Sequence, residues 1–266
     1  MSDGALFRCR ALRYHAAGQM KIATRPVIRI GTAGWAIPRT VADRFAASGS
    51  ALQRYAGRFD AAEINSTFYR PHRPDTYARW RDAVPEGFRF AVKLRRTVTH
   101  EKRLVGAGPD LAAFCKEVGA LGERLGPLLV QLPPSFAFDE GVVARFFGEL
   151  RQHTDGPAAC EPRNASWFTP EAASVLAEHR IARVAADPAK VPEAALPGGW
   201  AGLRYHRLHG SPRMYYSSYD PEILASLATA LTRSDAAETW CIFDNTTSGA
   251  AAANALALAE LAPAIR

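Results

Sequence analysis

The chain has few cysteines and no cysteine motif. Its four cysteines lie far apart in 266 residues and form no C-x-x-C pair, so neither a zinc site nor a redox dithiol is indicated. Cys160 stands next to Glu161 and therefore falls on the opposite face of its strand, where a small buried apolar side chain is expected. Free cysteines are typical of a reducing compartment, and we expect a cytoplasmic protein.

Long apolar runs and a phosphate fingerprint are also absent. No stretch approaches the ~18 uninterrupted apolar residues that a membrane span requires, so no membrane association is expected. The G-x-G-x-x-G motif of a dinucleotide-binding sheet is missing after the first predicted strand, and no H-x-H or H-E-x-x-H pair occurs. The sequence thus requires no cofactor and predicts no metal ligand.

The positive charge is unevenly distributed. The formal net charge is +7, of which residues 1–26 contribute +4, so the remainder is only mildly basic. These first residues lack amphipathic periodicity, and we expect a flexible basic extension. We expect residues 27–266 to form one domain, because this length is close to the ~250 residues typical of a single barrel.

Eight short apolar runs alternate with segments of helical period. Strand and helix alternation implies parallel strands joined by right-handed crossovers, and eight such units predict a single (β/α)₈ TIM-barrel-like α/β domain. The connection from Asp187 to Gly202 is rich in proline and glycine and has no helical period. The runs are Ile28 to Trp35, Ala61 to Thr67, Phe88 to Leu94, Leu128 to Leu132, Ala158 to Arg163, Ile181 to Asp187, Leu203 to His209 and Trp240 to Asn245.

Each predicted strand has one mostly apolar face, and polar residues collect on the other face toward the strand end. The apolar face would pack under helices, and the polar residues would line the C-terminal mouth of the barrel, where barrel enzymes have their active sites. Parity places Asn245 inward and Asp244 outward. The residues assigned to the mouth are Glu63, Asn65, Lys93, Gln131, Glu161, Arg163, Asp187, Tyr205, Arg207, His209 and Asn245.

The carboxylates and imidazoles of this set suggest acid/base chemistry. Glu63 and Glu161 are the candidates for general acid and base, with His209 and His100 as alternative proton carriers. Either carboxylate could instead neutralise a neighbouring cation, because buried charges are usually paired.

The remaining mouth residues suggest an anionic ligand. Lys93, Arg163 and Arg207 would bind its phosphate or carboxylate group. Polar side chains would orient the ligand and aromatic rings would wall the pocket, although loop aromatics often only pack against a barrel rim. The predicted orienting residues are Asn65, Gln131, Asp187 and Asn245, and the predicted wall is Tyr69, Trp167 and Tyr219.

Several ordered motifs carry a resemblance to a known family. They are Gly31 to Trp35, Glu63 to Tyr69, Phe90 to Lys93, Thr99-His100, Val130 to Pro134, Glu161 to Trp167, Arg207 to Gly210 and Phe243 to Thr246. Together they make residues 28–258 similar to the YecE-like family, domain of unknown function 72. The resemblance implies a TIM-barrel-like fold and no particular reaction. The chain departs from the family after Trp35, where an aromatic pair is usual, and at Asp244, where Asn is common.

We therefore predict an enzyme that acts on a small anionic substrate by acid/base or hydrolytic chemistry. One alternative is a module that binds single-stranded nucleic acid through the aromatic wall and the basic segment from Arg95 to Arg103. Another is a divalent-metal isomerase or endonuclease, with Glu63, Glu161, Asp187 and His209 as ligands. Nucleic acid is the less favoured partner.

Overall fold

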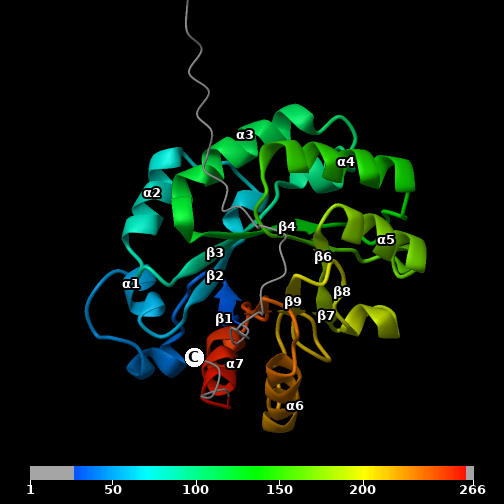
Figure 1. The fold of residues 1–266 in the computed structure, drawn as a ribbon. Coiled ribbons are helices and arrows are strands. Elements are labelled where there is room, and N and C mark those ends of the chain that lie inside the picture. Colours follow the sequence, from blue (N-terminus) through cyan, green and yellow to red (C-terminus); the bar gives the residue numbers. More distant parts are fainter. Residues whose placement is uncertain (1–26, 262–266) are drawn as a thin grey trace, which may run out of the picture.

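A parallel sheet curls into a nearly closed barrel with helices around its outside (Figure 1). The computed structural model describes residues 27–261, so the predicted extension over residues 1–26 lies outside the described residues. Within residues 27–261 the strand order is β7-β9-β10-β1-β2-β3-β4-β5-β6-β8. The strands are β1 (Val27–Ala33), β2 (Ala61–Ile64), β3 (Arg89–Lys93), β4 (Leu125–Gln131), β5 (Ala158–Glu161), β6 (Ile181–Arg183), β7 (Ala185–Asp187), β8 (Gly198–Gly199), β9 (Leu203–Leu208) and β10 (Glu238–Phe243).

All eight predicted strands are present, and the sixth is divided. Its first part, β6, pairs with β5, and its second part, β7, pairs with β9, so one run of chain links the two sides of the barrel. The short β8 then pairs antiparallel with β6. This strand comes from the irregular connection after Asp187, which contains no α-helix, so the sixth crossover differs from the others.

Helices follow the other strands as predicted. Ser50 caps the first helix with a capping box that includes Gln53, and Asp139 caps the fourth by accepting a bond from the backbone of Val142. The α-helices are α1 (Ala51–Ala56), α2 (Pro74–Asp82), α3 (Gly108–Val118), α4 (Glu140–His153), α5 (Pro170–Glu178), α6 (Pro221–Thr232) and α7 (Ala250–Leu261). The shorter turns are η1 (Arg39–Arg44), η2 (Ser66–Phe68), η3 (Thr97–Glu101), η4 (Gly119–Arg124), η5 (Ala165–Trp167) and η6 (Pro192–Ala195).

None of the helices within residues 27–261 has both the length and the apolar character to cross a membrane.

Small and large side chains share the inside of the barrel. Tyr205 and Trp240 stack with ring centroids 5.9 Å apart, and alanines on the other strands leave room for them. Gly126 is part of this fit, because a Cβ there would lie 2.7 Å from the Trp240 ring. The inner alanines are Ala61, Ala91, Ala159 and Ala182.

The outer faces of the strands pack under the helices in the larger hydrophobic core. Cys160 belongs to this core and is fully buried, as its parity predicts. Burial raises the pKa of its thiol well above the usual range, so the reactive thiolate is disfavoured. Cys160 is a packing residue.

Candidate functional site

On each of five strands, an inward polar residue lies two positions after a residue of the inner core, toward the carboxyl end of the strand. Ala61 precedes Glu63 by two positions, and the same spacing joins the inner-core residues of β3, β4, β5 and β9 to the next inward residues. Side chains two apart share a face, so these residues form a polar layer above the apolar core at the carboxyl ends of the strands. The layer contains Glu63, Lys93, Gln131, Glu161 and Arg207, in agreement with the predicted parity.

Arg207 is the centre of this layer and has no exposed surface. Its Nε and Nη2 donate to the two carboxylate oxygens of Glu63 over 3.0 and 2.7 Å. Its Nη1 donates to Glu161 Oε2 over 2.6 Å, and Nη2 also donates to Asp244 Oδ2 over 3.0 Å. The hydroxyl of Tyr205 completes the environment of Glu63 with a bond of 2.8 Å.

This pairing changes the interpretation of the two glutamates. Burial alone would raise the pKa of Glu161, but Arg207, His209 and Arg163 outweigh it and hold that pKa well below its usual range. Glu161 is therefore ionised, which disfavours the acid role that the sequence suggests. Both oxygens of Glu63 accept bonds from Arg207. In the structure both carboxylates contact cations, as the alternative of a charge-neutralising role expects.

His209 lies between two carboxylates. Its Nε2 is 2.8 Å from Glu161 Oε1 and its Nδ1 is 3.1 Å from Asp244 Oδ2. Burial disfavours the charged imidazole, but the charge of Glu161 and the bonds to both carboxylates raise its pKa. The geometry therefore favours an imidazolium that donates from both nitrogens.

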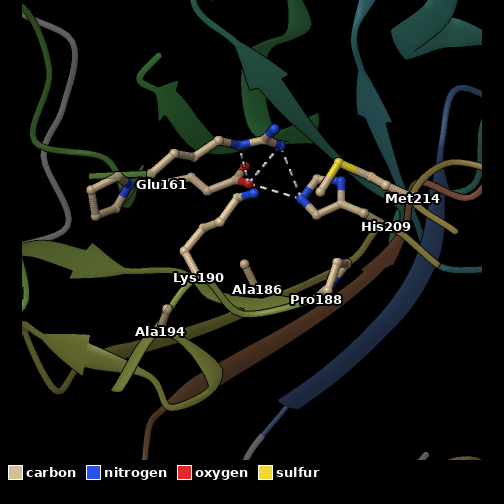
Figure 2. A pocket seen from close by; sticks show the side chains of 9 residues that line it. Glu161, Ala186, Pro188, Lys190, Ala194, His209 and Met214 are labelled. Atoms are coloured by element: carbon tan, nitrogen blue, oxygen red, sulfur yellow. Dashed lines mark hydrogen bonds and ion pairs between the residues drawn. The ribbon is translucent and has the colours of Figure 1, made fainter. Parts of the chain in front are cut away.

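A pocket opens beside His209 (Figure 2). It encloses about 300 Å³ of space, including the solvent at its mouth. Arg163 lies on its wall and donates to Glu161 Oε1 from Nη2 over 3.0 Å, while Nη1 is 3.4 Å from the Tyr215 hydroxyl. The lining residues are Glu161, Pro162, Arg163, Ala186, Pro188, Lys190, Ala194, His209 and Met214.

Lys93 ends β3, His100 lies in η3, and both contact the ring of Phe68. The amino nitrogen of Lys93 is 4.2 Å from the centroid of this ring, and the His100 ring packs edge-on against it at 5.0 Å. Burial and the charges of Lys93, Arg96 and Arg163 lower the pKa of His100, which favours the neutral imidazole. Tyr69 packs against Phe68 and is 81% exposed, so it stands at the rim.

Asn65 and Gln131 retain hydrogen-bonding capacity. Asn65 Nδ2 is 3.5 Å from Asp244 Oδ1, and Asn65 Oδ1 is a buried oxygen with no partner among the described residues. Gln131 is 7% exposed and pairs in register with Glu161. Both remain candidates for orienting a ligand.

Strand β10 required a correction of parity. Asp244 points inward, where it contacts Arg207 and His209, although the sequence suggests that it points outward. Asn245 points away and donates to Ser217 O and Asn254 Oδ1 over 2.9 Å each. The reason is that Trp240 lies inside the barrel, so even-numbered residues of β10 share its face. Counting from Trp240 in steps of two would have identified Asp244.

Three other residues that were predicted to contact the ligand, Trp167, Tyr219 and Asp187, do not line the pocket. Trp167 is fully buried, and its Nε1 donates to Phe136 O over 2.9 Å, so its ring is a core residue and not an exposed wall. Tyr219 donates to Asp187 Oδ2 over 2.6 Å, which engages both side chains with each other. Ala186 lines the pocket where Asp187 was expected.

Lys190 and Met214 line the pocket and were not predicted, and Tyr215, an aromatic residue of the loop after β9, contacts Arg163 on the pocket wall. Lys190 lies in the irregular connection after Asp187, and the other two lie in the loop after β9. Figure 2 shows Lys190 and Met214 beside Glu161 and His209. Loop residues have no strand parity, so the sequence carried no positional signal for them beyond the aromatic content of that loop.

Of the four proposed metal ligands, Glu161 and His209 are in contact, whereas Glu63 and Asp187 have other partners. Arg207 lies between Glu63 and Glu161, and Asp187 is bonded to Tyr219. Over the ranges that the structure describes, no group of three His, Cys, Asp or Glu residues is arranged to hold a metal ion.

The basic segment after β3 is largely paired. Arg95 forms an ion pair with Glu117, and Lys102 donates to Asp110 over 2.6 Å. Arg103 Nη2 donates to Ser135 O over 2.7 Å. Arg95 and Lys102 are thus paired with acids and the Trp167 ring is buried, whereas Arg96, Lys102 and Arg103 keep exposed side chains.

Comparison with known proteins identifies relatives over most of the chain. The family described as protein of unknown function DUF72 matches residues 29–265. The UPF0759 protein YecE of Escherichia coli K12 is 30% identical over 110 residues, which is 41% of this chain and 39% of that protein. The UPF0759 protein YunF of Bacillus subtilis is 29% identical over 150 residues, which is 54% of this chain and 53% of that protein. These alignments thus span about two fifths to one half of the curated relatives.

Solved structures give the same result for the fold. A DUF72 family protein of Enterococcus faecalis aligns with a TM-score of 0.74 and 24% identity, over 89% of this chain and 96% of that chain. A DUF72 family protein of Thermotoga maritima aligns with a TM-score of 0.72 and 26% identity, over 88% of this chain and 98% of that chain.

Proposed function

The chain belongs to the DUF72 family of proteins of unknown function, and from that premise we propose that its barrel mouth is the active site of an enzyme that acts on a small anionic substrate by acid/base chemistry. The substrate would carry a phosphate or carboxylate group. The observation that carries this proposal is the position of Arg163 on the pocket wall beside His209.

The charges of the mouth support an anion. Three carboxylates face four basic side chains, so the basic groups exceed the acids by one when all are charged. The carboxylates are those of Glu63, Glu161 and Asp244, and the basic groups are those of Lys93, Arg163, Arg207 and His209. Lys190 adds a further cation at the pocket. A low-dielectric site with this balance attracts an anion more strongly than a cation.

Arg163 is the group best suited to bind the anion. Its side chain is 14% exposed, and among the described residues its Nη1 meets a side-chain oxygen only at Tyr215, over 3.4 Å. A guanidinium group presents five N–H donors in a plane and matches the oxygens of phosphate or carboxylate. Arg207 has no exposed surface and would instead hold the carboxylates in place.

His209 is the candidate proton donor. It lines the pocket, and Glu161 and Asp244 fix its orientation through both ring nitrogens. In this proposal Glu161 is a positioning residue that raises the pKa of His209, while Glu63 anchors Arg207. His100 is the neutral base, and Asn65 and Gln131 orient the substrate.

Titration with inorganic phosphate tests the anion site. We expect phosphate to raise the melting temperature of the wild-type protein, and Arg163→Ala to weaken the apparent affinity by about 10- to 100-fold, because a charge-assisted hydrogen bond contributes about 1.5–3 kcal/mol. The matched control is Arg204→Ala, since Arg204 lies near the start of β9 and pairs with the exposed Asp235.

Equal phosphate affinities of the wild type and Arg163→Ala would contradict the proposal. Tight manganese binding that depends on Glu161 would support the alternative of a divalent-metal enzyme at this site. Turnover, once a substrate is found, should change little with salt, whereas nucleic-acid binding would weaken steeply.

A further inference from the structure

Lys93 is the inward cation of the mouth whose amino group remains unpaired. It ends β3, is 9% exposed, and has neither a hydrogen bond nor an ion pair with any described residue. Arg207 and His209, in contrast, are each bonded to two or more side chains. A buried amine without a partner is costly for stability, and such costs are commonly associated with function.

The surroundings of Lys93 make the neutral amine more accessible than it is in an ordinary lysine. Burial is the largest effect, and together with the charge of Arg207 it lowers the pKa of Lys93 to about 8. The Phe68 ring and the nearby carboxylates favour the ammonium form, but they do not offset burial. At pH 7 about a tenth of such amines are neutral, which is on the order of a few hundred-fold more than for an ordinary lysine.

We propose that Lys93 is a catalytic amine that condenses with the carbonyl group of a small anionic oxo compound, whose acid group is held at Arg163. The inference rests on the proposed function for its anion site and adds the substrate class, an aldehyde or ketone that carries a carboxylate or phosphate. The supporting geometry is an amine without a hydrogen bond or ion pair at a strand end, in the same polar layer as Glu161. Glu161 also lines the pocket, where Arg163 Nη1 has only the 3.4 Å contact with the Tyr215 hydroxyl.

The condensation balances without a further reactant. The nitrogen lone pair of neutral Lys93 attacks the carbonyl carbon, a C–N bond forms, and the carbonyl oxygen takes up a proton to give a carbinolamine. The nitrogen gives up both of its protons in turn, one for each of the two that the oxygen takes up, and the C–O bond breaks, so that one water molecule leaves and a C=N bond remains. Protonation of this imine gives an iminium ion, whose positive charge would lie over the Phe68 ring.

His100 is placed to carry the protons. It packs against the same Phe68 ring as the Lys93 amine, and its lowered pKa leaves it able to accept a proton at neutral pH. His100 is only partly buried, so it can return the proton to solvent. Its Nδ1 is 2.9 Å from the Thr99 hydroxyl, which fixes the ring.

Reductive trapping tests the amine. The wild-type protein is incubated near pH 7 with glyoxylate and cyanoborohydride, and the lysines that gain a carboxymethyl group are identified by peptide mass spectrometry. We expect Lys93 to be modified at least ten times faster than the lysines outside the mouth, Lys102 and Lys116. Equal rates at the three positions, or a slower rate at Lys93, would overturn the inference.

Two further measurements separate this inference from the anion site. Lys93→Arg keeps a positive charge, so it should still bind phosphate while the fast modification disappears. Phosphate should also slow the modification of Lys93 in the wild-type protein. Fast modification of Lys93 that phosphate does not slow would support Lys93 as a reactive amine and contradict the anion site. Phosphate binding without fast modification of Lys93 would support the anion site and contradict the role of Lys93.

Discussion

Arg207 Nη1 lies 2.6 Å from Glu161 Oε2, and the two side chains are 0% and 1% exposed. The same guanidinium group also contacts Glu63 and Asp244, so one buried cation binds three acids. Such a group is held by its partners in a defined orientation, and removal of the cation leaves largely buried carboxylates without this partner. The network thus fixes the positions of Glu161 and Asp244, which in turn orient His209.

Removal of the central cation should destabilise the protein strongly. Arg207→Met keeps much of the side-chain volume but leaves three carboxylates without this partner, and we expect a loss of about 3–5 kcal/mol in the free energy of unfolding. Urea unfolding followed by circular dichroism measures the loss. Arg204→Ala, on the same strand with a partly exposed ion pair, should cost less than about 1 kcal/mol. A similar small cost for Arg207→Met would show that the network is not a stabilising centre.

The outline of the barrel is readable from the sequence because strand periodicity is a local property. The apolar runs and their inward parity placed Glu63, Lys93, Gln131, Glu161 and Arg207 on one layer before any contact was known. The pairing of Glu63 with Arg207 was not readable in this way, since the two residues are 144 positions apart. Which cation neutralises which acid depends on how the strands close, and several combinations were equally compatible with the pattern.

The errors on aromatic and strand-end residues have a common physical cause. Trp240 faces inward because small alanine side chains on other strands of the barrel leave room for it there, and this orientation places Asp244 inward and Asn245 outward. Trp167 similarly fills the core beneath the rim, because Phe136 supplies a carbonyl for its indole N–H. Packing of this kind is decided by the tertiary structure, whereas the sequence shows only that aromatic residues occur in these loops.

His209 should make stability depend on pH on the alkaline side. Its pKa in the folded state is raised above the ordinary value of 6.5, so its stabilising contribution is fully present below 6.5 and is lost as the pH rises through the folded pKa. We expect the free energy of unfolding of the wild-type protein to fall over this interval and that of His209→Gln to fall less. Urea unfolding at several pH values from 5.5 to 8.5 measures the difference, and parallel profiles would contradict it.

Glu161 and Asp244 should make the protein less stable as the pH becomes acidic, whereas His209 makes it less stable as the pH rises. Arg207 and His209 outweigh burial and lower the pKa of both carboxyl groups, so their contribution is present above the unfolded pKa values near 4 and is lost as the pH falls through the folded values. The wild-type protein should therefore unfold in acid at a lower pH than Asp244→Ala does. Acid titration followed by tryptophan fluorescence tests this order.

Lys93→Met should stabilise the protein at neutral pH. The pKa of Lys93 is lowered to about 8, which means that folding below pH 8 must bury a charge without a partner. Methionine fills the same space over Phe68 without this cost, and we expect a gain of up to about 3 kcal/mol at pH 7. The gain should shrink as the pH rises above about 8 and vanish above the unfolded pKa, where the lysine is neutral in both states. A variant that is less stable than the wild type at pH 7 would show that the ammonium group is favoured where it lies.

Asp244→Asn should strengthen anion binding. The change keeps an oxygen that can accept from Arg207 but removes one negative charge from the mouth, and this charge lies 3.1 Å from His209 Nδ1. We expect phosphate affinity to rise about 3- to 10-fold, a modest effect because neighbouring charges and solvent screen the interaction. The pKa of His209, followed by NMR of its ring protons, should fall at the same time, because the bond to a carboxylate that raises it is lost. Asp235→Asn removes an exposed carboxylate that pairs with Arg204 near the start of β9, away from the mouth, and serves as the control. Weaker phosphate binding by a folded Asp244→Asn protein would mean that Asp244 positions His209 or Arg207 for the anion, and that its charge matters less than its geometry.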